Sequence, residues 1–164
     1  MEPNARRQLY DWFTARPRAL KALRLANKGC TAFVYAAYIL LCLFLLLGRD
    51  YRLFKVLSVP GVVFFSGSWL RAAINCPRPY ENGGTPSLFN KETRGKSFPS
   101  RHVFCAAVIA VAWGYILPAA GLFMALVALA VAALRVAGGV HWPRDVFAGL
   151  LYGGLLGLAG FYLL

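Results

Sequence analysis

Two histidines, an aspartate and several arginines lie in short polar stretches between long apolar segments of this chain. The histidines are His102 and His141, and Asp145 follows His141 in the same polar stretch. Isolated charges are costly at membrane depth, so ionisable groups beside apolar segments indicate a functional site. Arginine forks match phosphate oxygens, and imidazole groups can act as nucleophile, acid or base. Together these residue types predict the transfer of a phosphoryl group.

The candidate residues fall into three motifs, each at the end of an apolar segment: Arg71-x6-Arg78-Pro79, Pro99-Ser100-Arg101-His102 and Arg135-x5-His141-x3-Asp145. In this order and spacing, the motifs resemble those of the type 2 phosphatidic acid phosphatase superfamily, which also includes the vanadium haloperoxidases. The resemblance covers about residues 53–164. Three positions depart from the family pattern: Arg71 replaces Lys, Arg101 replaces Gly and Leu134 replaces Ser. None of these changes removes an essential chemical group.

The arginines and one serine suit the binding of phosphate. Arg71, Arg78 and Arg135 are candidates because charge-assisted hydrogen bonds are about twice as strong as neutral ones. Ser100 precedes an expected helix, so its hydroxyl and the following backbone N–H groups, beginning with that of Arg101, can face an anion. A plain N-cap is the alternative interpretation of Ser100. The side chain of Arg101 adds positive charge or bulk at the mouth of the site.

The two histidines and the aspartate suit covalent catalysis. An imidazole acts as a nucleophile only when it is neutral and correctly oriented toward the atom it attacks. Asp145 can fix the tautomer of His141 by accepting a hydrogen bond from the ring nitrogen that does not attack. The resemblance implies that His141 forms a phosphohistidine. It also implies that His102 protonates the leaving oxygen and later activates water. Few carboxylates and no ligand cluster predict that no protein-bound metal or other cofactor takes part.

Composition indicates a small membrane protein with a single domain. The chain has 164 residues, 59% of them hydrophobic, and a mean hydropathy of +0.57, which is unusual for a soluble domain. Residues 1–29 are too charged to span a membrane and predict an amphipathic helix at its surface, interrupted near Pro17. Residues 30–164 are expected to form the transmembrane domain. It is an all-α bundle of five expected spans: 30–47, 53–75, 100–117, 118–136 and 143–164.

The formal net charge of +12 bears on the partners of the protein. Basic residues flank the apolar segments, which favours anionic lipids and a lipid phosphate substrate over nucleic acid. The four cysteines lack metal-ligand spacing and are expected to be small buried residues. The spacing of Gly149, Gly153 and Gly157 favours close packing of helices within the bundle, with a homo-oligomer as the alternative.

The loop expected between the second and third spans carries further polar side chains: Tyr80, Glu81, Asn82, Lys91, Arg94 and Lys96. Two interpretations of this loop are equally compatible with the sequence. The side chains can recognise a headgroup or a phosphate, or they can belong to a solvated loop at the membrane interface. Its prolines and glycines are typical of turns.

The combined pattern predicts metal-independent hydrolysis of a phosphate monoester or diphosphate on a membrane lipid. The resemblance implies phosphatidic acid, phosphatidylglycerophosphate or a polyprenyl diphosphate such as undecaprenyl diphosphate. Two alternatives stay open: a lipid phosphotransferase that uses the same site, and a non-catalytic membrane protein that binds anionic lipid. Two spans precede the first motif, so the site and the N-terminus share one side. Seven basic residues before the first span favour the cytoplasmic side of the cell membrane.

Overall fold

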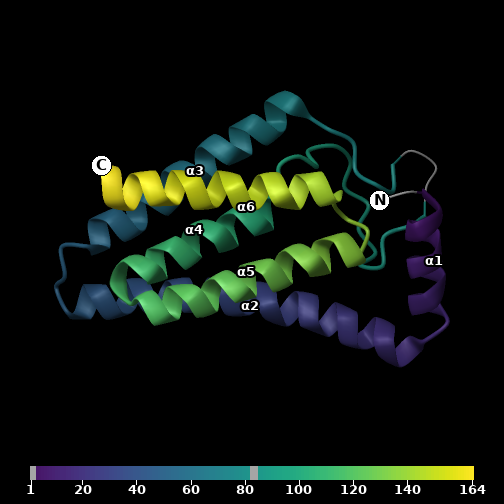
Figure 1. The fold of residues 1–164 in the computed structure, drawn as a ribbon, viewed down its shortest axis with the longest axis horizontal. Helices are drawn as coiled ribbons and strands as arrows, with labels where there is room; N and C mark the ends of the chain where they lie inside the picture. The colour runs from purple at the N-terminus through teal and green to yellow at the C-terminus, as the bar shows by residue number, and fades with distance from the viewer. Residues whose placement is uncertain (1–2, 82–84) are drawn as a thin grey trace.

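In the computed structural model, which describes residues 3–81 and 85–164, all regular secondary structure is helical (Figure 1). Along these residues the α-helices and one terminal π-helical turn follow in this order: α1 Pro3–Thr14, α2 Pro17–Leu47, α3 Leu53–Ile74, α4 Arg101–Ile116, α5 Pro118–Ala137, α6 Pro143–Leu158 and η1 Ala159–Leu163. The prediction of an all-α bundle is confirmed. Prolines in the first turns of α2, α5 and α6 suit these positions, because an N–H there has no partner within the helix.

Four helices of the described chain are long and apolar enough to cross a membrane: α2, α3, α5, and α6 together with η1. The fifth expected span corresponds to α4, which has only 16 residues. At 1.5 Å per residue it is about 24 Å long, shorter than the hydrocarbon core of about 30 Å. The protein is thus an integral membrane protein in which α4 is a short, enclosed helix.

The core of the bundle is built around α4. This helix packs against α2, α3, α5 and α6, and every residue from Val103 to Ala110 is buried. A helix that is apolar on all sides has no polar face for water and must be covered by lipid or by other elements, and here the neighbouring helices cover it. The first turn of α4 carries the second motif, so the centre of the bundle positions His102.

The helix α2 begins earlier than the sequence predicts. The expected boundary between residues 29 and 30 lies inside this helix, which continues from Pro17 without a break. Its 31 residues span about 46 Å, so its basic first half extends beyond a hydrocarbon core of about 30 Å. Only the segment before Pro17 forms a separate helix, because proline is tolerated in a first helical turn but not in a helix interior.

The loops that carry the motifs all lie at one end of the bundle. In Figure 1 the loops between α3 and α4 and between α5 and α6 are at the right, and the C-terminus is at the left. Helix α1 lies across the right-hand end, beside the α3–α4 loop. There the guanidinium of Arg6 donates hydrogen bonds to the carbonyl oxygens of Pro79 and Thr85. The N-terminal helix is therefore attached to the loop that follows the first motif.

A line of glycines on α6 allows this helix to lie close to α4. Gly149, Gly153 and Gly157 are all buried. A Cβ at Gly153 would overlap the backbone of Phe104, and one at Gly157 would lie 3.2 Å from Val111. Close packing within the bundle, the favoured interpretation of this spacing, is what the structure shows, and the homo-oligomer stays a prediction.

Replacement of Gly153 with alanine will destabilise the protein by about 1–3 kcal/mol, because the new methyl group meets backbone that cannot rotate away. The matched control is Gly154→Ala on the same helix, where nothing lies within 4 Å of the added carbon. Thermal unfolding of the purified variants in one detergent measures the difference. Equal melting temperatures for the two variants would contradict the close contact between α4 and α6.

Candidate active site

Backbone and side-chain contacts join the three motifs at the end of the bundle. The backbone N–H of Ser100 donates to the carbonyl oxygen of Asp145 at 2.8 Å, which links the starts of α4 and α6. The guanidinium of Arg78 donates to the carbonyl oxygen of Val140 at 3.4 Å. The first motif therefore contacts Val140, the residue before His141. The second motif contacts Asp145, the last residue of the third motif. Residues 45 and 62 positions apart in sequence meet here.

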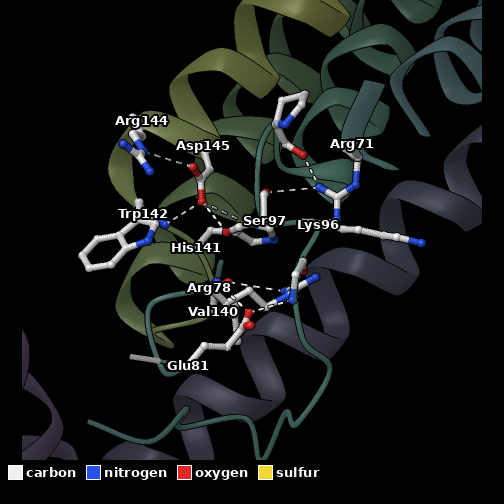
Figure 2. Close-up of polar contacts among 12 residues, drawn as sticks. Arg71, Arg78, Glu81, Lys96, Ser97, Val140, His141, Trp142, Arg144 and Asp145 are labelled. Carbon is white, nitrogen blue, oxygen red and sulfur yellow. Dashed lines mark hydrogen bonds and ion pairs between the residues drawn. The ribbon is translucent and has the colours of Figure 1, made fainter. Parts of the chain in front are cut away.

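His141 lies in a buried cluster with Asp145 and Ser97 (Figure 2). Its Nδ1 is 3.6 Å from Asp145 Oδ2 and 3.4 Å from the hydroxyl oxygen of Ser97. The same carboxylate oxygen accepts hydrogen bonds from Ser97 Oγ at 2.5 Å and from the backbone N–H of Trp142 at 3.0 Å. One face of the imidazole is thus occupied by the carboxylate and the serine, which leaves Nε2 as the nitrogen for an incoming group.

Burial keeps His141 neutral. Removal from water lowers the pKa of His141 to about 4, and the neighbouring Arg78 acts in the same direction. The hydrogen bond and charge of Asp145 oppose this shift without cancelling it. Since imidazole is a nucleophile only in its neutral form, His141 is in the reactive protonation state throughout the physiological pH range.

Arg71, at the last turn of α3, holds the segment that precedes α4. Its guanidinium donates to the carbonyl oxygens of Ser97, at 3.2 Å, and of Pro99 and Lys96. These contacts, drawn in Figure 2, occupy several of the five N–H groups that an arginine offers. Arg71 therefore fixes the backbone that carries Ser97. Its predicted role as a phosphate ligand stays a prediction.

Arg78 is held by the loop around it. Its Nε donates to the carbonyl oxygen of Gly95 at 3.0 Å. Glu81 closes the same loop, because its Oε1 accepts hydrogen bonds at 2.7 Å from the backbone N–H groups of both Arg78 and Gly95. Glu81 thus organises the loop, while Asn82 lies outside the described residues. The side chain of Arg78 is 6% exposed, so its charge is directed inward.

The second motif places a serine, an arginine and a histidine at the start of α4. Ser100 is the residue before the helix, yet its hydroxyl makes no capping bond. This hydroxyl is buried and has no hydrogen-bond partner among the described residues. A buried polar group without a partner is costly, so this hydroxyl is a candidate hydrogen-bond donor to a ligand, and its role in binding phosphate stays a prediction. Arg101 is exposed, and His102 is half-buried beside Thr31 and Cys105.

Arg135 occupies the last turn of α5 and faces α2. It is 5% exposed, and its Nη2 donates to the hydroxyl of Thr31 at 3.2 Å. Its Nε is buried and has no hydrogen-bond partner within the described residues. The site therefore contains an arginine with unused donors next to the histidine-bearing turn of α4. That is the geometry expected of an anion-binding group.

The sequence did not single out two residues that shape this site, Ser97 and Thr31. Both are neutral hydroxyl side chains, and nothing in their spacing distinguishes them from other serines and threonines. Among residues 3–81 and 85–164, no three histidine, cysteine, aspartate or glutamate side chains gather to hold a metal ion. The four cysteines are free thiols. Cys105 is buried as expected, whereas Cys30, Cys42 and Cys76 are only partly buried.

Comparisons with known proteins agree with this fold. The family model described as the PAP2 superfamily matches residues 52–164, more than half of the chain. The protein therefore belongs to the PAP2 superfamily. No curated protein sequence matches it.

Two solved structures share its architecture. The chain is similar to Aquifex aeolicus LpxE, with 26% identity and a TM-score of 0.67 over 86% of this chain and 93% of that one. It also has the fold of the first transmembrane PAP2 type phosphatidylglycerolphosphate phosphatase from Bacillus subtilis. There the identity is 22% and the TM-score 0.72, over 96% of this chain and 83% of that one.

Proposed function

We propose that this protein is a metal-independent phosphatase that removes a phosphoryl group from a membrane lipid through a phosphohistidine on His141. The observation that carries the proposal is the buried cluster at the start of α6. There the Nδ1 side of His141 faces Asp145 and Ser97, and its Nε2 is left for attack. The hydroxyl of Ser100 and the Nε of Arg135, which have no hydrogen-bond partner among the described residues, are the donors we assign to the anion.

The reaction divides into two displacements at phosphorus. In the first, Nε2 of His141 forms a bond to phosphorus while the bond to the lipid oxygen breaks, and His102 gives that oxygen a proton. In the second, His102 takes a proton from water, whose oxygen attacks phosphorus as the nitrogen–phosphorus bond breaks. The products are the dephosphorylated lipid and inorganic phosphate. Asp145 keeps the proton of His141 on Nδ1 in both steps.

The position of the site supports a lipid as the substrate. The cluster lies at one end of a bundle whose membrane-spanning helices expose many large apolar side chains, so a lipid chain can stay in the bilayer while its phosphate reaches the arginines. Phosphatidic acid, phosphatidylglycerophosphate and polyprenyl diphosphates such as undecaprenyl diphosphate are the candidates. One of the two similar solved structures is that of a phosphatidylglycerolphosphate phosphatase, which supports including that lipid.

The direct test is phosphate release from each purified lipid phosphate in detergent, with a chelator present and no acceptor lipid. We expect release from at least one of these lipids, unaffected by the chelator and abolished by vanadate, which mimics pentacoordinate phosphorus. Release that requires added metal would contradict the proposal. Transfer that occurs only when an acceptor lipid is added would identify a phosphotransferase instead.

The alkaline side of the pH profile will depend on Lys91. Burial lowers the pKa of Lys91 to about 8, and the nearby charges of Arg78, Arg135 and Arg101 act in the same direction. The ammonium therefore loses its proton as the pH rises through about 8, and phosphate is then attracted less strongly. We expect KM to rise above this pH in the natural protein and to change less in Lys91→Met. Parallel profiles for the two proteins would contradict this role of Lys91.

We also infer that the site faces the cytoplasm, because the basic first half of α2 lies at the same end. The test uses variants without natural cysteines that carry either Arg94→Cys, on the loop at the site end, or Arg49→Cys, at the other end. Both residues are exposed. An impermeant thiol reagent added to intact cells should label only the cysteine at position 49. Labelling of position 94 alone would show that the site faces outward.

A further inference from the structure

The loop between α3 and α4 carries a candidate phosphate ligand but has no regular structure of its own. It runs from residue 75 to residue 100, and its described parts, 75–81 and 85–100, contain only turns and irregular backbone. Arg78 lies in this loop. A long irregular loop has no ladder of backbone hydrogen bonds to hold it, so contacts from other elements must fix it if Arg78 is to keep one position.

Two arginines from the first helices of the chain donate to backbone carbonyl groups of this loop. Arg6, on α1, donates to the carbonyl oxygens of Pro79 and Thr85. Arg24, on α2, donates from Nε to the carbonyl oxygen of Leu88 at 2.7 Å. Hydrogen bonds from a charged guanidinium are about twice as strong as those between neutral groups. Cations from two different helices therefore attach the loop at three carbonyl groups.

These arginines bind the loop and not an acidic side chain. The ion pairs among the described residues include neither Arg6 nor Arg24. The second contact of Arg24 is to the amide oxygen of Asn90, at 3.1 Å from its Nη2, and Asn90 belongs to the same loop. Burial lowers the pKa of Arg6, as expected of a cation partly withdrawn from water. Both guanidinium groups are thus committed to the loop backbone and its side chains.

The bonds from Arg6 act directly beside Arg78. Because Pro79 follows Arg78 in the chain, a fixed Pro79 carbonyl restricts the backbone of Arg78. The side chain of Arg78 reaches from there to the carbonyl oxygen of Val140 at 3.4 Å. A hydrogen bond of that length is near the limit, so a shift of the loop by about 1 Å would break it. The position of Arg78 therefore depends on the contact that Arg6 makes.

The bond from Arg24 acts where the loop meets the turn between α5 and α6. The carbonyl group of Leu88 accepts from Arg24, while its backbone N–H donates to the carbonyl oxygen of Gly138 at 3.1 Å. Arg6 lies beside the same turn, because a Cβ at Gly139 would be 3.6 Å from its Nε. Both arginines therefore hold the loop against the turn that leads into the third motif.

We propose that Arg6 and Arg24 are positioning residues that hold Arg78 at the reacting phosphate. Both precede residues 52–164, the part of the chain that the family model matches. The first helices thus complete a site whose motifs all lie in that later part. The inference rests on the proposed phosphatase function and adds two residues to it. Loss of either guanidinium weakens phosphate binding but removes no group that reacts.

The test measures kcat, KM and the inhibition constant of vanadate for phosphate release by the natural protein, Arg6→Gln and Arg24→Gln. We expect KM and the inhibition constant to rise about tenfold in each variant, because Arg78 is displaced, while kcat changes less than about threefold. Arg6→Lys keeps a charged donor and should recover part of the loss. The matched control is Arg7→Gln, because Arg7 is the exposed neighbour of Arg6 on α1 and should be dispensable.

Vanadate binding gives a second measurement that needs no turnover. The stabilisation of each purified protein against thermal unfolding at increasing vanadate concentration gives the dissociation constant. If the natural protein binds vanadate but releases phosphate from no lipid, the proposed function is wrong. A dissociation constant about tenfold higher in Arg6→Gln would then still support the positioning role, and an unchanged constant would overturn it.

The remaining outcomes decide between positioning and a merely structural role. If Arg6→Gln and Arg24→Gln lower the melting temperature but leave KM and vanadate binding unchanged, both residues only stabilise the fold and the inference is overturned. An equal loss of vanadate binding in Arg7→Gln would also overturn it, because the cause would then be general positive charge on α1. A natural protein that binds no vanadate would contradict both the inference and the proposed function.

Discussion

Replacement of His141 with alanine will lower kcat for phosphate release by about ten-thousand-fold or more, because the atom that bonds to phosphorus is removed. His141 is 4% exposed and its Nδ1 side is filled by Asp145 and Ser97, which leaves Nε2 as the atom that can bond to phosphorus. The measurement is single-turnover and steady-state release from the best lipid substrate.

His141→Gln keeps the approximate size of the side chain and controls for a cavity left by alanine. Arg49→Gln, at the opposite end of the bundle, controls for handling in detergent and should keep full activity. Each variant must unfold in a single transition before its rate is interpreted. A His141→Gln enzyme that retained a tenth of the natural kcat would contradict the role of His141 as nucleophile.

Replacement of Asp145 with asparagine will lower kcat about a thousandfold while KM changes less than about threefold. Oδ2 of Asp145 accepts two hydrogen bonds and faces His141 Nδ1 at 3.6 Å. An amide there offers an N–H to one of these partners, which favours the wrong tautomer of His141. KM should change little, because the hydrogen-bond donors assigned to phosphate lie on other residues.

The pH dependence of activity gives a second test of the role of Asp145. Burial lowers the pKa of His141 to about 4, and Asp145 raises it against this effect. Without the carboxylate, the pKa of His141 should fall further, so any loss of activity through protonation of His141 moves to lower pH. Ser97→Ala should lower kcat less than Asp145→Asn does. A purely structural role of Asp145 would change stability and KM without moving the acid side of the profile.

The sequence predicted the bundle and the end at which the site lies, for reasons that are physical. Successive membrane-spanning segments run in opposite directions, so the end of one segment and the start of the next lie on the same side of the membrane. The ends of the second and fourth segments and the starts of the third and fifth therefore lie on one side. This places Arg71, Ser100, Arg135 and His141 at one end of the molecule, before any contact is known.

The contacts inside the site were not predictable in the same way. Ser97 and Glu81 belong to a loop without periodicity, and their partners are set by how that loop folds back between α3 and α4. The guanidinium of Arg71 lies against three backbone carbonyl groups, which its predicted role at the phosphate did not suggest. The early start of α2 was missed because charge was taken to exclude a spanning helix. A long helix accommodates those charges beyond the hydrocarbon core.

The most direct test of the central claim is to trap the phosphorylated protein. Lipid phosphate labelled in its phosphoryl group is mixed with the enzyme, turnover is stopped within milliseconds in alkaline denaturant, and the labelled peptide is identified by mass spectrometry. The account predicts an acid-labile phosphoryl group on His141 and none in His141→Gln. An acid-stable label on Ser97 or Ser100, or rapid phosphate release with no labelled protein at any time, would contradict it.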